Sequence, residues 1–195
     1  VSGSAGTGKT IVALHRAVFL ARRYPDARVL LATFSEPLAR ALHVRLRRLV
    51  GSDPRLADRL EVHSLDAIAL RLYRANGGRE AIADAGVIGE LLQETAASQP
   101  GMKHSPQFLL AEWTHVVDAW QLDSWDAYRD VARLGRRTRL PESQRRSLWT
   151  LFEALRVRLR ERNLVTRAEA LTRLAGQIAT SDRTPFQFIV LDEAQ

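Results

Sequence analysis

Residues 3–10 read Gly3-Ser4-Ala5-Gly6-Thr7-Gly8-Lys9-Thr10, and the helix-forming run Ile11-Val12-Ala13-Leu14 follows at once. Glycines at these spacings let backbone N–H groups converge on an anion at the start of a helix. Lys9 is then placed to reach the β- and γ-phosphates of a nucleotide, and the Thr10 hydroxyl to bind Mg²⁺. The stretch predicts a nucleotide-binding loop; the alternative is a glycine-rich turn with a chance lysine.

The other end of the sequence carries an acidic pair. Residues 186–195 read Phe186-Gln187-Phe188-Ile189-Val190-Leu191-Asp192-Glu193-Ala194-Gln195. The apolar run 188–191 is too short for a globular helix and predicts a buried parallel strand. Ligands bind at the carboxyl ends of such strands, so we expect Asp192 to hold Mg²⁺ beside Thr10 and Glu193 to polarise an attacking water. A solvated acidic loop is the alternative.

Between these ends the pattern changes near Asn76. Before it, apolar strands at 28–34 and 60–63 alternate with helices at 37–50 and 64–74, which indicates a parallel, doubly wound sheet. After it, helical periodicity dominates, with helix starts at Ser105, Ser124, Pro141 and Thr166. We therefore expect an α/β domain in residues 1–76 and 164–195, with an all-helical insertion in residues 77–163. Only two residues precede the glycine loop, so we expect an incomplete domain from a longer protein.

Four segments in this order carry a family resemblance: GSAGTGKT (3–10), TFSEPLARAL (33–42), EVHSLDAIA (61–69) and VLDEAQ (190–195). Together they resemble UvrD/Rep-type superfamily 1 DNA helicases over the whole chain. The resemblance implies a RecA-like P-loop NTPase motor domain with ATP and Mg²⁺ as cofactors. It also implies that residues 77–163 are the accessory helical insertion of that family.

The resemblance assigns further roles. Gln195 would couple the γ-phosphate to the nucleic-acid site, beside the catalytic Lys9 and Glu193. Single-stranded DNA would contact two segments, the first formed by Thr33, Phe34 and Ser35 and the second by His63 and Ser64. Phe34 is available for base stacking. The pair Glu36-Pro37 departs from the commoner polar-basic pair of the family. Without the resemblance, core packing is the alternative for Phe34 and His63.

Composition bounds the class of protein. The 195 residues contain no cysteine, which fits a reducing compartment, so we expect a cytoplasmic protein. No apolar run approaches the length of a membrane helix, so we expect no membrane partner. The net charge is +7, a weak indication of a nucleic-acid partner.

The basic charge is concentrated in one stretch. Residues 129–173 hold 13 arginines against five acidic residues, so they carry +8 and the rest of the chain −1. Helical spacing places Arg145, Trp149, Arg156 and Arg160 on one flank of a helix. This flank could grip duplex phosphates, or it could be a solvated face on which Trp149 closes the core. The four tryptophans are expected mainly in the core.

The leading hypothesis is the ATP-binding half of a DNA helicase or translocase that moves 3′→5′ on single-stranded DNA and unwinds duplexes, as in DNA repair. Its partners would be single-stranded and duplex DNA and a second motor domain of the same chain. Because arginines from that second domain complete the ATP site in the family, residues 1–195 alone should hydrolyse ATP weakly. The alternative is a nucleotide-gated remodelling or regulatory ATPase acting on a protein complex such as RNA polymerase. A small-molecule kinase is disfavoured because no segment of the sequence can be recognised as a lid or as a pocket for the acceptor substrate.

Overall fold

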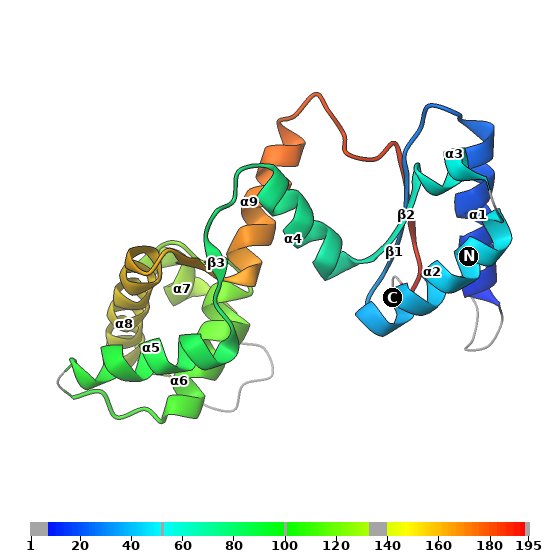
Figure 1. The fold of residues 1–195 in the computed structure, drawn as a ribbon. Coiled ribbons are helices and arrows are strands. Elements are labelled where there is room, and N and C mark those ends of the chain that lie inside the picture. The colour runs from blue at the N-terminus through cyan, green and yellow to red at the C-terminus, as the bar shows by residue number, and fades with distance from the viewer. Residues whose placement is uncertain (1–7, 52, 100, 133–139, 194–195) are drawn as a thin grey trace. The chain divides into compact units, whose positions relative to one another are not determined.

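The computed structural model describes residues 8–51, 53–99, 101–132 and 140–193. The chain forms two compact units (Figure 1), which are described separately. Unit 1 comprises residues 1–76 and 176–195, and unit 2 comprises Gly77–Ala175.

Unit 1 is built from alternating helices and strands. Its elements are α1 (Lys9–Arg23), β1 (Val29–Thr33), α2 (Glu36–Val50), α3 (Pro54–Ala57), β2 (Leu60–Ser64), α4 (Leu65–Ala75) and β5 (Phe188–Leu191). Among the described residues, the sheet has the order β2-β1-β5 and both pairings are parallel. The mixed helix and parallel-sheet fold expected from the sequence is confirmed, although the sheet is small.

The two faces of the sheet are covered differently. On one face, α1 and α2 pack over alternate strand residues that include Leu31, Val62 and Val190. On the other face, Ile68 and Leu72 of α4 pack near Leu30 and Ala32 of β1. The expected burial of β5 is only half right, because Ile189 and Leu191 are 58% and 49% exposed. Both side chains point to the face opposite α1, and none of the described residues of β5 belongs to the apolar cluster that α4 forms on that face.

Unit 2 is mainly helical. Its elements are β3 (Ala81–Ile82), α5 (Ala85–Ala97), α6 (Pro106–Glu112), the π-helix η1 (Trp113–Asp118), α7 (Trp125–Asp130), α8 (Glu142–Glu161), β4 (Leu164–Val165) and α9 (Arg167–Ala179), which continues into unit 1. An aromatic cluster fills the core: the Tyr128 ring stacks on Trp149 at 5.6 Å and meets Phe152 edge-on at 6.0 Å. Four leucines of α8 are buried in the same core: Leu148, Leu151, Leu155 and Leu159.

Three details of unit 2 differ from the sequence expectation. It is not all-helical, because β3 and β4 pair in parallel; two-residue strands are too short to show a period. The same pairing, together with the Arg173–Glu80 ion pair at 2.6 Å, holds residues 164–175 in unit 2, so the second boundary falls later than residue 164. Trp120 is one of the four tryptophans expected mainly in the core, but it is 71% exposed. The wider turn of η1 rotates it away from the side of the helix that carries the buried residues Trp113, Val116 and Val117.

Candidate nucleotide and nucleic-acid site

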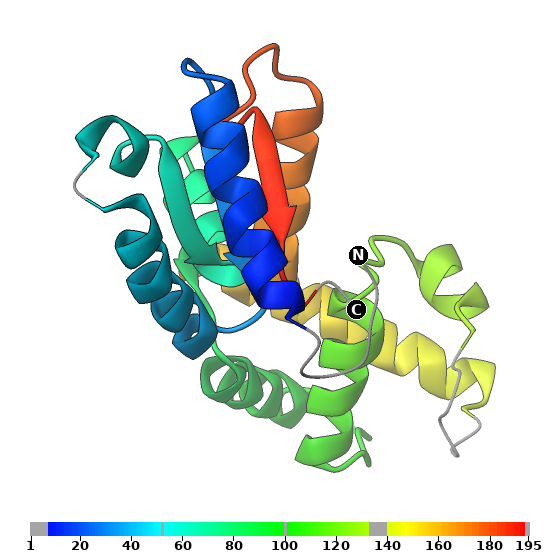
Figure 2. The ribbon, with the colours of Figure 1, turned by 90° about the vertical axis from the view of Figure 1, so that its right-hand side faces the viewer.

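The carboxyl ends of β1, β2 and β5 meet at one edge of the unit 1 sheet, because all three strands run in the same direction. The start of α1 lies at this edge too. The short turn after Arg23 returns the chain to the amino end of β1, so α1 runs opposite to the strands, and it packs along β1 and β5 (Figure 2). This edge brings Lys9, Thr10 and Asp192 to the same end of unit 1.

Gly8 ends the glycine loop and caps α1. Its φ of +80° lies in the left-handed region that favours glycine, and its carbonyl oxygen accepts hydrogen bonds from the Ile11 and Val12 N–H groups. The first turn of α1 contains no acidic residue, so the helix dipole presents its positive end without a competing carboxylate. Lys9 and Thr10 lie in this turn and are partly buried. The expected phosphate-binding residues Gly3, Ser4, Ala5, Gly6 and Thr7 lie outside the described residues.

Asp192 follows β5 directly. Its N–H donates to the Ala32 carbonyl oxygen at 2.9 Å, which extends the pairing with β1 by one residue. The side chain is 5% exposed, and its Oδ2 atom has no hydrogen-bond partner within the described ranges. Glu193 is exposed and adopts a φ of +58°, a conformation that costs a non-glycine residue free energy and is more common at functional sites. Gln195 lies outside the described residues.

These donors fit a magnesium–nucleotide complex. A buried carboxylate oxygen without a protein partner is costly unless a cation or donor occupies it. Mg²⁺ is commonly bound through one or two protein oxygens together with substrate phosphates and waters. Asp192 and Thr10 would supply those oxygens. Among the described residues no cluster of three His, Cys, Asp or Glu side chains forms a separate metal cage.

The first predicted DNA-contacting segment does not behave as one group. Phe34 follows β1 and is 78% exposed, so its ring is accessible for stacking. Thr33 is completely buried, and its Oγ1 atom has no hydrogen-bond partner among the residues that the structure describes. Ser35 is the N-cap of α2, where its hydroxyl accepts the Leu38 N–H at 3.4 Å. Only Phe34 of the three presents most of its side chain to solvent.

The second predicted segment is tied to the first by a hydrogen bond. Ser64 is buried at the N-cap of α4, accepts the Ala67 N–H at 3.2 Å, and donates to the Glu36 carboxylate at 2.9 Å. Glu36, noticed in the sequence only as a departure from the family, thus links the residues that follow β1 and β2. A serine three residues before a helix N–H signals a cap, but the partner across 28 residues could not be read from the sequence.

His63 belongs to a charged cluster that sequence reasoning missed. Its Nε2 atom lies 3.2 Å from Glu61 and 3.2 Å from an Arg71 nitrogen, and Arg28 and Arg71 both contact Glu61 at 2.5 Å. Burial alone would raise the pKa of Glu61, but hydrogen bonds from Arg71, Arg28 and His63 and the charge of Arg71 outweigh it, so the pKa is lowered. The i, i+2 spacing of Glu61 and His63 on one strand was the available signal.

In unit 2, Arg156 lies against the aromatic core. Its guanidinium lies over the Trp149 ring at 5.1 Å and the Trp113 ring at 5.6 Å, and it donates to the Leu122 carbonyl oxygen. Burial lowers its pKa, against the attraction of nearby carboxylates, chiefly Glu169. These contacts favour the structural reading of Arg156 over phosphate binding.

The other two arginines of the α8 flank differ from each other. Arg145 is partly buried and donates to the Arg129 carbonyl oxygen. Arg160 is exposed and forms no ion pair with the described residues. It is the one member of the predicted DNA-gripping set whose charge is open to solvent.

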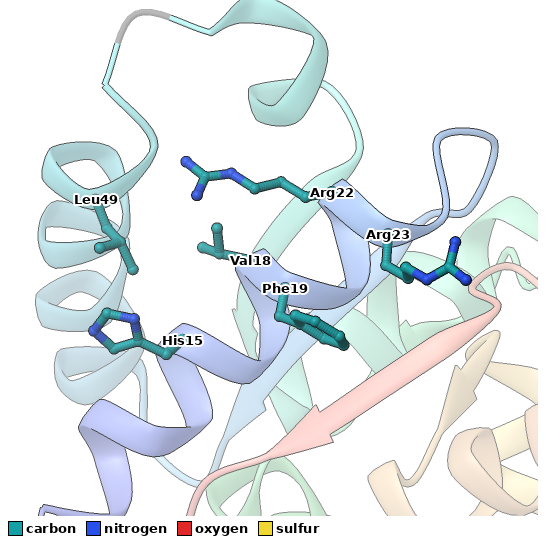
Figure 3. A pocket seen from close by; sticks show the side chains of 6 residues that line it. All are labelled: His15, Val18, Phe19, Arg22, Arg23 and Leu49. Atoms are coloured by element: carbon teal, nitrogen blue, oxygen red, sulfur yellow. The ribbon is translucent and has the colours of Figure 1, made fainter.

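Counting charge by structural unit changes its distribution. Unit 1 contains 14 Lys and Arg against nine Asp and Glu, or +5, whereas unit 2 contains 15 against 13, or +2. Within unit 1, α1 and α2 carry eight basic residues and only Glu36 as an acid. Figure 3 shows part of this surface, where His15 and Arg22 of α1 turn toward Leu49 of α2. The stretch 129–173 is basic because the acidic residues that balance it within unit 2 lie elsewhere in the sequence, outside residues 129–173.

The fold and this site define a mixed α/β protein with a parallel sheet, consistent with a helicase motor domain. The sequence matches the family described as UvrD/REP helicase N-terminal domain over residues 1–195, and the chain belongs to this family. Membership gives it a helicase-family role in ATP binding and implies DNA binding. None of the curated proteins compared with the chain matches it. Within the described ranges, no helix has the length and apolar character needed to cross a membrane.

Proposed function

We propose that the chain is the ATP-binding half of a DNA helicase or translocase that moves 3′→5′ along single-stranded DNA and unwinds duplexes, with a second motor domain of the same protein completing the ATP site. The carrying observation is the carboxyl edge of the unit 1 sheet. There the acid-free start of α1 lies at the same end as the buried carboxylate of Asp192, whose Oδ2 atom has no hydrogen-bond partner among the described residues. Unit 2 serves as the helical insertion, and we retain the cytoplasmic location as a prediction.

The roles divide along this edge. Lys9 binds the β- and γ-phosphates, while Thr10 and Asp192 hold Mg²⁺, which supplies charge neutralisation of the phosphates when bound. Glu193 accepts a proton from the attacking water. Gln195 couples this site to DNA.

DNA contacts concentrate on Phe34. Its exposed ring follows β1 by one residue, and β1 and β5 are neighbours, so a base stacked on Phe34 lies near the strand that carries Asp192. A shift at either strand end is transmitted through paired backbone, and the Ser64–Glu36 hydrogen bond joins the β2 end to the same region. This proximity supports coupling between nucleotide and DNA.

The test is strand displacement by the intact protein with ATP and Mg²⁺. Duplexes with a 3′ single-stranded tail should be unwound, and those with a 5′ tail should not. ATP turnover without displacement, together with DNA affinity that is flat in salt, would favour the regulatory ATPase acting on a protein complex.

A further inference from the structure

Thr33 and Asp192 are neighbours across two strands. Ala32 pairs with Leu191, and the Asp192 N–H donates to the Ala32 carbonyl oxygen, so the next positions in register are Thr33 and Asp192. Side chains alternate along a strand, and Leu31 and Val190 lie on the face that α1 covers. Thr33 and Asp192, two residues further on, therefore share that face.

Both side chains are buried with an unused polar atom. Thr33 is 0% exposed and Asp192 5% exposed, and in the part of the chain that the structure describes neither Thr33 Oγ1 nor Asp192 Oδ2 has a hydrogen-bond partner. A hydroxyl can donate and a carboxylate can only accept, so the two atoms are complementary. A buried polar atom left unpaired destabilises the fold, so two such atoms at adjacent positions are best explained together.

The neighbour on the other side of Thr33 does not compete for its hydroxyl. Ser64 is in register with Thr33 on β2, but its Oγ atom donates to Glu36 and accepts from Ala67, and it forms no hydrogen bond with Thr33 Oγ1. Nor can DNA reach Thr33, because its side chain has no accessible surface. The DNA-contacting role that the family resemblance implies for Thr33 is therefore not open to this side chain in the structure.

We propose that Thr33 is a positioning residue of the nucleotide site: when nucleotide and Mg²⁺ are bound, its hydroxyl, which has no partner among the described residues here, donates to the Asp192 carboxylate and orients it toward Mg²⁺. The inference rests on the proposed function, since it needs Asp192 to be a metal ligand. Residues that hold a ligand in place typically contribute about 10- to 100-fold to metal affinity.

The experiment uses the intact protein and three variants. Thr33→Val removes the hydroxyl at nearly constant shape, Thr33→Ser restores it, and Ser35→Ala removes a nearby hydroxyl that caps α2. Calorimetry measures ADP binding with and without Mg²⁺, and fluorescence anisotropy measures binding of a labelled oligo-dT. Melting curves establish that each variant is folded.

Thr33→Val should weaken the Mg²⁺-dependent part of ADP binding about tenfold or more, leave oligo-dT affinity unchanged, and be rescued by Thr33→Ser. Ser35→Ala should leave the Mg²⁺ dependence intact. Loss of oligo-dT affinity in Thr33→Val with unchanged Mg²⁺ dependence overturns the inference in favour of a DNA contact. Unchanged binding of both ligands also overturns it. If the unsubstituted protein shows no Mg²⁺-dependent ADP binding, the proposed function fails instead.

Discussion

The carboxyl edge of the unit 1 sheet and the α8 flank of unit 2 both carry residues that the sequence marks as ligand contacts, yet the fold treats them differently. At the sheet edge, Asp192 is buried with an oxygen that the protein leaves unpartnered, and Phe34 is open to solvent. On α8, Arg156 is covered by two indole rings and bonded to a carbonyl oxygen. A charged residue indicates a ligand site only where folding leaves its polar atoms unused.

The largest effect should come from Asp192→Asn. Removing the charge deprives Mg²⁺ of its carboxylate, and we expect ATP hydrolysis by the intact protein to fall by about 10²–10³-fold, similar to the loss of a key electrostatic group. Without bound Mg²⁺ the melting temperature should not fall, because Oδ2 has no hydrogen-bond partner to lose among the described residues. Retained hydrolysis, or marked destabilisation, would mean that Asp192 is a structural residue like Arg156.

Phe34→Ala tests the solvent-exposed residue at the carboxyl edge of the unit 1 sheet. Stacking on an aromatic side chain contributes about 1–3 kcal/mol per base, so oligo-dT affinity should fall by that amount. Stability should hardly change, since the ring is 78% exposed. Anisotropy titrations with oligo-dT and melting curves check both statements; a large stability loss with unchanged DNA affinity would assign Phe34 to packing.

Arg156→Ala tests the covered arginine on the α8 flank of unit 2. The variant loses two cation–π contacts and leaves the Leu122 carbonyl oxygen without this donor, so the free energy of unfolding should drop by about 2 kcal/mol. The salt dependence of duplex DNA binding should stay the same. Arg160→Ala is the matched control on the same helix, with an expected change in stability below about 0.5 kcal/mol. If duplex DNA affinity depends less steeply on salt concentration in Arg156→Ala, the α8 flank is assigned to DNA binding instead.

The smallest effect concerns Asp118 in unit 2. Burial raises its pKa above the usual 3.8, more than hydrogen bonds from Thr166 and Gln121 lower it. Ionising Asp118 therefore costs more in the folded state, and its stability contribution declines as pH rises above 3.8 through the raised pKa. Asp118→Asn keeps Oδ1, which accepts both hydrogen bonds. Its melting temperature should exceed that of the unsubstituted protein at neutral pH, and the difference should vanish below pH 3.8.

Glu61 in unit 1 provides the control of opposite sign. Its pKa is lowered, so its ion pairs stabilise the fold above the ordinary value of 4.5, and this stability is lost as pH falls through the lowered pKa. Glu61→Gln should melt at a lower temperature at neutral pH, and the difference should disappear in acid. The same sign for both variants would contradict the two environments described here.

Local patterns were sufficient to predict the parallel strands and most helix starts. Ser64, Ser105 and Ser124 each cap the helix that follows, since one hydroxyl and one N–H three residues on define the interaction. The burial of Thr33 and the exposure of Ile189 depend instead on which helices and strands pack against each position, and this is a tertiary property.

Charge was the least predictable feature. Residues 129–173 are strongly basic as a window, but folding brings them together with acidic residues such as Glu94, which pairs with Arg158 and Arg162. Conversely, the near-neutral remainder of the sequence contains the basic helices α1 and α2. The boundaries of the compact units do not coincide with a window of the sequence. Counted by unit, the larger net charge belongs to unit 1, with +5, and not to unit 2, with +2.

The account depends most directly on nucleotide binding at the start of α1. Calorimetric titration of the intact protein and of Lys9→Ala with ATP and Mg²⁺ measures this. We expect the unsubstituted protein to bind, and Lys9→Ala to lose about 2–5 kcal/mol of binding free energy with an unchanged melting temperature. Equal ATP affinity in the two proteins would contradict the assignment of the sheet edge as the nucleotide site.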